Sequence, residues 1–97
     1  MKKTISIFGV TGSVGNSTIE ILRKNKSEFD LISITCNDDI DKIISLAKEF
    51  NPKIVATANE KKFKELKKNL PNHIKCLFGT EGICEAASYE SDIVIAS

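Results

Sequence analysis

The sequence contains no tryptophan, one tyrosine, one histidine and three cysteines, and its net charge is only +1. A chain with balanced charge has no overall field to attract nucleic acid or an anionic membrane, so we expect neither partner. A metal site needs several converging histidine, cysteine or carboxylate ligands, and the linear sequence shows no such cluster. These shortages favour a small-molecule ligand over a polymer, a membrane or a metal held by this chain alone.

The thiols also indicate a compartment. Cys36, Cys76 and Cys84 are odd in number and form no C-x-x-C pair, and no apolar signal segment follows Lys2 and Lys3. We therefore expect a cytoplasmic protein whose reduced cysteines are small core residues. The lone His73 is expected in a loop or at a strand edge. A length of 97 residues allows one domain with one modest core.

One stretch organises the chain: the apolar run from Ile5 to Phe8 stops at Gly9, and Gly12 and Gly15 follow at intervals of three. This pattern predicts a strand, a tight turn and a helix. Glycines allow the turn, a close approach of the backbone to a ligand, and packing of the helix on the strand. The N–H groups of the first helical turn then attract a pyrophosphate. A plain structural turn is the alternative, whereas a P-loop is excluded because Asn16 precedes Ser17 where a lysine is required.

Hydrophobic periodicity predicts strands that alternate with helices along the whole chain. Such alternation is typical of an α/β fold, here a Rossmann-like doubly wound parallel sheet of about five strands with helices on both faces. In that architecture ligands bind at the carboxyl ends of the strands, near the switch in strand order. The predicted strands cover residues 4–8, 31–36, 54–57, 74–78 and 92–96, and the predicted helices cover residues 13–25, 40–50, a segment capped by Asn59, and 80–88.

The periodicity also predicts which side chains the helices bury. They are Val14, Ile19, Ile21 and Leu22 in the first helix; Ile40, Ile43, Ile44, Ala47 and Phe50 in the second; Phe63, Leu66 and Leu70 in the third; and Ile83, Cys84 and Ala87 in the fourth. Lysines 61, 62, 64, 67 and 68 are expected to point to water. A nucleic-acid patch is the other interpretation of these lysines, but no aromatic residues are interleaved with them.

The glycine stretch from Gly9 to Thr18 resembles the G-x-T-G-S-I/V-G-x-S-T opening of the 1-deoxy-D-xylulose 5-phosphate reductoisomerase family. The order of elements, including Phe50-Asn51-Pro52-Lys53 before the third strand, is similar throughout, although the resemblance covers only the family's amino-terminal part. It implies an NADPH-dependent homodimer that uses Mg²⁺ or Mn²⁺. Such enzymes convert the phosphorylated sugar 1-deoxy-D-xylulose 5-phosphate to 2-C-methyl-D-erythritol 4-phosphate in non-mevalonate isoprenoid synthesis.

The resemblance also places the cofactor. It implies cofactor-phosphate contacts at Thr11, Gly12, Ser13 and Val14, and it places the family's metal and catalytic residues downstream of this chain. No catalytic residue is therefore expected within residues 1–97, which should form the dinucleotide-binding domain of a longer enzyme. The fifth strand, whose edge would otherwise be uncovered, favours the same conclusion.

A second cofactor contact is implied after the second strand, where the family usually has a small residue, glycine, a variable and often basic residue, and asparagine. Ungapped counting puts these on Cys36, Asn37, Asp38 and Asp39. An acidic side chain here suits the free 2′-hydroxyl of NAD and repels the 2′-phosphate of NADP. Alternatively, both aspartates cap the helix that begins at Ile40 and leave Asn37 to meet the ribose.

Two other functions stay open from the residues alone. A semialdehyde dehydrogenase also has a G-x-T-G-x-x-G loop, but the continuation from Ser13 to Thr18 fits that class less well. A non-enzymatic flavodoxin-like interaction domain would place Asp38 and Asp39 at its strand ends, but it does not need three glycines after its first strand.

Overall fold

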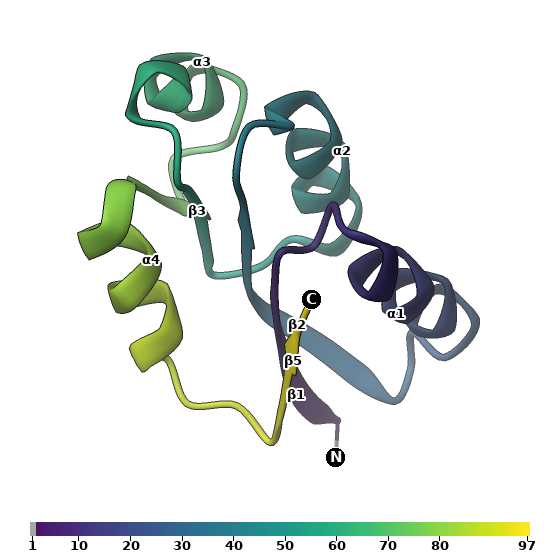
Figure 1. The fold of residues 1–97 in the computed structure, drawn as a ribbon. Helices are drawn as coiled ribbons and strands as arrows, with labels where there is room; N and C mark the ends of the chain where they lie inside the picture. The colour runs from purple at the N-terminus through teal and green to yellow at the C-terminus, as the bar shows by residue number, and fades with distance from the viewer. Residues whose placement is uncertain (1) are drawn as a thin grey trace.

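The computed structural model describes residues 2–97, which form one sheet of five parallel strands in the order β4-β3-β2-β1-β5 (Figure 1). This confirms the predicted Rossmann-like α/β fold. The elements are β1 (Lys3–Phe8), α1 (Ser13–Lys24), β2 (Phe29–Cys36), α2 (Ile40–Phe50), β3 (Ile54–Thr57), η1 (Glu60–Lys62), α3 (Phe63–Lys68), β4 (Lys75–Phe78), α4 (Gly79–Ser88) and β5 (Ile93–Ala96).

Helices cover both faces of the sheet. The larger core lies between the strands and α1, α2 and α3, and it includes Ile7, Ile34 and Val55, which are fully buried. The smaller core lies on the opposite face, where α4 packs its Ala86 on Ile54 and neighbouring side chains. The chain moves from β1 outward to β4 and then returns through α4 to β5 on the other side of β1 (Figure 1). The strand order therefore switches between β1 and β5.

The buried face of α1 matches the prediction at Ile19 and Leu22 but not at Val14 and Ile21. Val14 and Ile21 are 52% and 57% exposed, whereas Gly15, Ile19 and Leu22 are buried. The spacing of Gly15, Ile19 and Leu22 is i, i+4 and i+7, which is one helical stripe. Hydrophobicity alone could not reveal this stripe because its first member is a glycine.

The buried face of α2 was predicted more closely. Ile40, Ile43 and Ala47 are buried as expected, Leu46 joins them, and Ile44 and Phe50 are half-buried at the border of the core; the whole set is in or against the main cluster. The helix ends at Asn51, which adopts a left-handed conformation with φ of 53°. Asparagine tolerates that conformation better than most residues.

The third and fourth helical segments required more correction. The predicted lysine-rich helix divides into the 3₁₀ turn η1 and the short helix α3, in which Leu66 is buried and Phe63 is half-buried. Asn59 caps this segment as expected, since its side chain accepts a hydrogen bond from the Lys61 N–H at 3.0 Å. Lys62 is half-buried and does not simply point to water.

In α4, Gly82 and Ala86 are buried, whereas Ile83 is half-buried and Ala87 is exposed. An ideal Cβ on Gly82 would lie 2.9 Å from the Leu77 Cβ, so a small residue is needed where α4 crosses the sheet. Cys84 is exposed, contrary to prediction, because it falls outside the stripe that Gly82 and Ala86 define.

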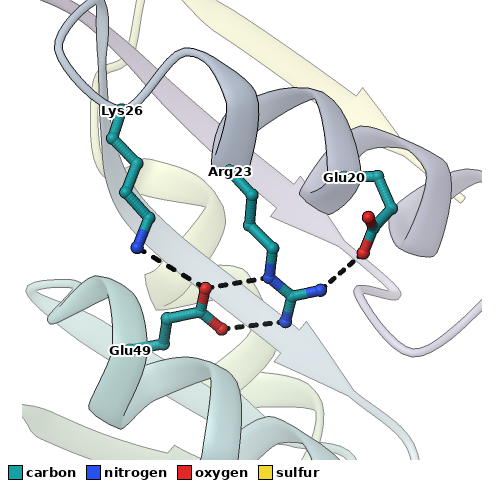
Figure 2. Close-up of polar contacts among 4 residues, drawn as sticks. All are labelled: Glu20, Arg23, Lys26 and Glu49. Carbon is teal, nitrogen blue, oxygen red and sulfur yellow. Dashed lines mark hydrogen bonds and ion pairs between the residues drawn. The ribbon is translucent and has the colours of Figure 1, made fainter.

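An ion cluster links the outer surfaces of α1 and α2 (Figure 2). The Arg23 guanidinium donates from Nε and Nη2 to the two carboxylate oxygens of Glu49, each at 2.8 Å, and from Nη1 to Glu20 at 2.5 Å. The Lys26 Nζ lies 3.7 Å from Glu49. Arg23 holds the pKa of Glu49 below its usual range.

None of the helices within residues 2–97 has the length and apolar character needed to cross a bilayer.

Candidate functional site

The turn after β1 is held in one conformation by β2. Gly9 has φ of +76°, a value that L side chains rarely adopt, and its N–H donates to the Thr35 Oγ1 at 3.0 Å. The next N–H, that of Val10, donates to the Thr35 carbonyl at 2.8 Å, and the Gly12 N–H donates back to the Gly9 carbonyl at 3.0 Å. The turn is therefore tight and fixed to the neighbouring strand.

Gly15 lets α1 approach the end of β1 closely. An ideal Cβ at this position would lie 2.5 Å from the Val10 carbonyl oxygen, which is backbone and cannot easily move. An ideal Cβ on Gly12 would lie 2.6 Å from the Ser97 Oγ and 3.3 Å from the Gly9 carbonyl oxygen. The glycines thus allow the tight turn and the close packing of the helix on the strand, which are two of the three roles expected from the sequence.

The amino terminus of α1 opens at this turn. Gly12 is the N-cap residue and supplies no side-chain hydrogen bond. Within residues 2–97, the N–H groups of Ser13 and Val14 have no hydrogen-bond partner, and both residues are exposed. The Gly15 N–H donates to the Ser97 Oγ at 3.3 Å. Unpaired N–H groups at the positive end of a helix dipole form a site for an anion.

The loop after β2 lies at the same edge of the sheet, the one formed by the carboxyl ends of the strands, because β1 and β2 are parallel neighbours. Asn37, Asp38 and Asp39 are all exposed. The Asp39 carboxylate accepts from the Lys42 N–H at 3.2 Å and caps α2, as the alternative prediction stated for both aspartates. The Asp38 carboxylate does not cap the helix but accepts from the Asn59 Nδ2 at 2.8 Å. Of the three side chains, the Asn37 amide takes part in no recorded hydrogen bond within residues 2–97.

A hollow of about 300 Å³ lies between the glycine turn, the end of β2 and α4. It is lined by Gly9, Thr35, Cys36, Asn37, Ala58, Thr80, Ile83 and Cys84. Burial raises the pKa of the Cys36 thiol to about 11, so this thiol is protonated at neutral pH and is a poor nucleophile. The hollow can hold a ring or a ribose, but the Cys36 thiol is not activated for covalent chemistry.

Other candidate groups lie away from this edge. The His73 Nε2 is 2.6 Å from the Asn51 Oδ1, in the loops that precede β3 and β4, at the opposite edge of the sheet. His73 is exposed in a loop, as expected. Across the part of the chain that the structure describes, residues 2–97, no three histidine, cysteine, aspartate or glutamate side chains gather as a metal site requires.

Comparison with known proteins identifies the family. A sequence profile of 1-deoxy-D-xylulose 5-phosphate reductoisomerase matches residues 5–97. The chain belongs to the 1-deoxy-D-xylulose 5-phosphate reductoisomerase family. Among its relatives, the reductoisomerase of Caldanaerobacter subterraneus subsp. tengcongensis is 39% identical over 97 residues, which is 100% of this chain and 25% of that protein. The Clostridium perfringens (strain 13 / Type A) enzyme is 41% identical over 99 residues, covering 98% of this chain and 26% of that protein.

Solved reductoisomerases have the same fold. The Zymomonas mobilis reductoisomerase in complex with NADPH superposes with a TM-score of 0.92 at 26% identity, covering 97% of this chain and 25% of that one. A reductoisomerase in complex with NADPH, fosmidomycin and magnesium superposes with a TM-score of 0.86 at 29% identity, over 95% of this chain and 23% of that one. The chain thus spans about a quarter of the length of the reductoisomerases it matches.

Membership of the reductoisomerase family sets aside the semialdehyde dehydrogenase and flavodoxin-like alternatives. The structure brings the two predicted groups, residues 11–14 and residues 37–39, to one edge of the sheet. Sequence reasoning missed the bonds of Thr35 and Ser97 to the glycine turn, and the bond from the Lys62 Nζ to the Asp38 carbonyl at 3.0 Å. Thr35 was detectable only as a polar residue near the end of a buried strand, and no local pattern marked the other two residues.

Proposed function

We propose that this chain is the NADPH-binding part of a 1-deoxy-D-xylulose 5-phosphate reductoisomerase. The observation that carries the proposal is the open amino terminus of α1, where the N–H groups of Ser13 and Val14 lie beside the fixed turn at Gly9. Family membership and the solved Zymomonas mobilis relative in complex with NADPH support it.

Different residues at this edge of the sheet bind different parts of the cofactor. Ser13 and Val14 bind the pyrophosphate through their backbone N–H groups, and Thr11 and Ser13 bind it through their hydroxyls. Gly12, whose own N–H is bonded to the Gly9 carbonyl, contributes by letting the pyrophosphate approach the backbone closely. Asn37 meets the ribose, and the backbone of Asp38 and Asp39 borders it. The hollow beside Cys36 accepts the adenosine half. When bound, NADPH supplies the hydride for a reduction; the residues of this chain bind and orient it.

For the complete gene product, we propose the reaction that the family resemblance implies. It rearranges and reduces 1-deoxy-D-xylulose 5-phosphate to 2-C-methyl-D-erythritol 4-phosphate, as a cytoplasmic homodimer that uses Mg²⁺ or Mn²⁺. Residues 2–97 hold no cluster of metal ligands. Because the chain spans about a quarter of its relatives' length and resembles the amino-terminal part of the family, we assign metal binding, the phosphorylated sugar and the catalytic groups to parts of the enzyme outside this chain, and residues 1–97 to a dinucleotide-binding domain.

Calorimetric titration of the complete gene product with NADPH tests this proposal. A Gly12→Val variant should stay folded, because Gly12 has φ of −79°, which other residues can adopt. Its branched side chain should nevertheless displace Ser97 and fill the approach to the Ser13 and Val14 N–H groups, so that NADPH binding is lost. Ser17→Ala, on the exposed side of the same helix, is the matched control and should bind normally. Unchanged NADPH affinity in a folded Gly12→Val protein would refute the assignment of the turn.

A further inference from the structure

The segment between β3 and α3 is attached to the loop after β2. The Thr57 Oγ1 donates to the Asn37 carbonyl at 2.7 Å, and the Ala58 N–H donates to the Cys36 carbonyl at 2.8 Å. The Asn59 N–H adds a bond to the Asn37 carbonyl at 3.3 Å. Because β3 pairs with β2 up to Thr57, these bonds continue the sheet into the two loops. Residues that follow β3 are therefore held beside Asn37 and Asp38.

This attachment changes the electrostatics of the acidic loop. The Asp38 carboxylate is held by the Asn59 amide at 2.8 Å, and the Asp39 carboxylate is engaged at the start of α2. The Lys62 Nζ, from η1, donates to the Asp38 carbonyl at 3.0 Å. Lys62 is half-buried, whereas Lys61, Lys64, Lys67 and Lys68 are exposed. A cation from the next segment thus rests on the backbone of the acidic loop that follows β2.

We propose that Lys62 is the residue that gives this chain its preference for NADPH over NADH. The inference rests on the proposed function, that is, on NADPH binding at this edge. In doubly wound dinucleotide folds, the residue after the second strand lies at the ribose 2′ position, and a nearby cation accommodates the 2′-phosphate. Asp38 occupies that place in this chain, and the Lys62 ammonium lies against its carbonyl.

The geometry also explains how an acid can be tolerated at this position. An ammonium group has three donors, and the Asp38 carbonyl takes one, which leaves two for phosphate oxygens. The bond between Asp38 and Asn59 fixes one carboxylate oxygen to the η1 side of the loop. A groove lined by Asn37, Asp38, Ala58, Asn59, Glu60 and Lys61 opens beside these groups. Lys62 therefore supplies, from the next segment, the positive charge that Asp38 itself does not provide.

The test compares the dissociation constants of NADPH and NADH for the complete gene product and its variants, by calorimetry. Lys62→Met should weaken NADPH binding roughly tenfold and change NADH binding less than about twofold, because only NADPH carries the 2′-phosphate. Lys62→Arg should keep most of the preference. Lys68→Met removes the same charge from an exposed position on α3 and should change neither constant. The preference of the parent protein should also fall as salt is raised.

The outcomes separate the two proposals. If the parent protein binds neither dinucleotide, the proposed function itself is wrong. If the parent binds NADPH but Lys62→Met leaves the NADPH to NADH ratio unmoved, or weakens both equally, Lys62 has at most a structural role and the inference is overturned. Thermal melts of each variant identify any general loss of folding, and Lys62→Gln gives a second neutral substitution if the methionine variant melts early.

Discussion

Thr35 is the residue on which the conformation of the cofactor turn depends. Its side chain is 4% exposed, its Oγ1 accepts the Gly9 N–H, and its carbonyl accepts the Val10 N–H. Two successive N–H groups of the turn are therefore paired with one residue of the neighbouring strand. Because a glycine with positive φ has wide freedom, this pairing is what selects a single conformation of the turn.

Thr35→Val should destabilise the protein and weaken cofactor binding together. Valine keeps the β-branched shape but leaves the half-buried Gly9 N–H without its acceptor, at a cost of about 0.5–1.5 kcal/mol. The turn would then be less well ordered, and we expect several-fold weaker NADPH binding. Urea unfolding and calorimetry measure the two effects. Thr35→Ser restores the acceptor and should recover most of the affinity; if the valine variant binds NADPH as the parent does, the turn does not need Thr35.

At the scale of residues, the sequence predicted roles that depend on backbone geometry better than roles that depend on distant partners. The positions of Gly9 and Gly15 follow from local pattern, since a turn and a close helix contact each exclude a side chain. Asp39 as a cap also follows from local pattern. The bond from Lys62 to Asp38 joins residues 24 positions apart, and its existence depends on the pairing of β2 and β3.

The contact of α1 with the end of β1 connects the sheet to the cofactor edge. Gly15 is buried at this contact, and an ideal Cβ there would lie 2.5 Å from the Val10 carbonyl oxygen. The same helix carries the Ser13 and Val14 N–H groups at its start. Any shift of α1 away from β1 therefore moves the proposed pyrophosphate site as well.

Gly15→Ala should destabilise the protein although alanine is the better helix former. The added methyl must push α1 away from backbone atoms, and overpacking of this kind costs about 1–3 kcal/mol, more than the gain of up to about 1 kcal/mol in helix propensity. Urea unfolding monitored by circular dichroism measures the difference. The control Ser17→Ala lies on the exposed side of α1 and should change stability by no more than about 0.5 kcal/mol. A Gly15→Ala protein as stable as the control would contradict the close contact.

The ion cluster between α1 and α2 predicts a pH dependence (Figure 2). Arg23 lowers the pKa of Glu49 in the folded state below the ordinary value of 4.5. A carboxyl whose folded pKa is lowered stabilises the fold above its unfolded pKa, and this stability is lost as the pH falls through the folded pKa. Glu49→Gln should therefore lower the melting temperature slightly at pH 7 and have a smaller effect at pH 2. Because the pair is partly exposed, the effect at pH 7 should shrink in 1 M salt. An equal effect at both pH values would exclude the ion pair as its cause.

The sequence predicted the existence and order of the elements better than their buried faces. Alternating apolar runs with polar breaks predicted each strand, and every helix except the lysine-rich one, to within a few residues. The face of α1 was misjudged because Gly15 packs inward while Val14 and Ile21 face water. Similarly, α4 packs through Gly82 and Ala86, so Cys84 faces outward. In both helices a small residue makes the closest contact, and small residues give a weak hydrophobic signal.

On the scale of the whole molecule, the strand order places β1 in the middle of the functional edge. β2 and β5 flank it, so the turn after β1 meets the loop after β2 on one side and Ser97, just after β5, on the other. The order switches between β1 and β5, which is where ligands of doubly wound sheets bind. The sequence predicted ligand binding near the switch in strand order but not the contact of Ser97 with the glycine turn.

The two outer strands differ in how they face water. Lys75, on β4, is exposed and forms an ion pair with Glu85 of α4, whereas Val94, on β5, is 58% exposed. Charged residues discourage edge-to-edge pairing of sheets, and an apolar edge promotes it. Residues 1–97 produced alone should therefore self-associate through β5.

Sedimentation of residues 1–97 tests this prediction. Val94→Lys should weaken self-association roughly tenfold, because it puts a charge on the free edge. Ile21→Lys is the matched control, since Ile21 is 57% exposed but lies on α1, and it should have little effect. If the parent fragment is monomeric at high concentration with a sharp melt, or if both lysine variants act alike, association through β5 is excluded.

Cofactor binding at the glycine turn is tested most directly by a crystal structure of the complete gene product with NADPH bound. We expect pyrophosphate oxygens within hydrogen-bond distance of the Ser13 and Val14 N–H groups, the ribose beside Asn37, and the turn at Gly9 still bonded to Thr35. A cofactor bound elsewhere, with the amino terminus of α1 free of phosphate, would contradict this assignment.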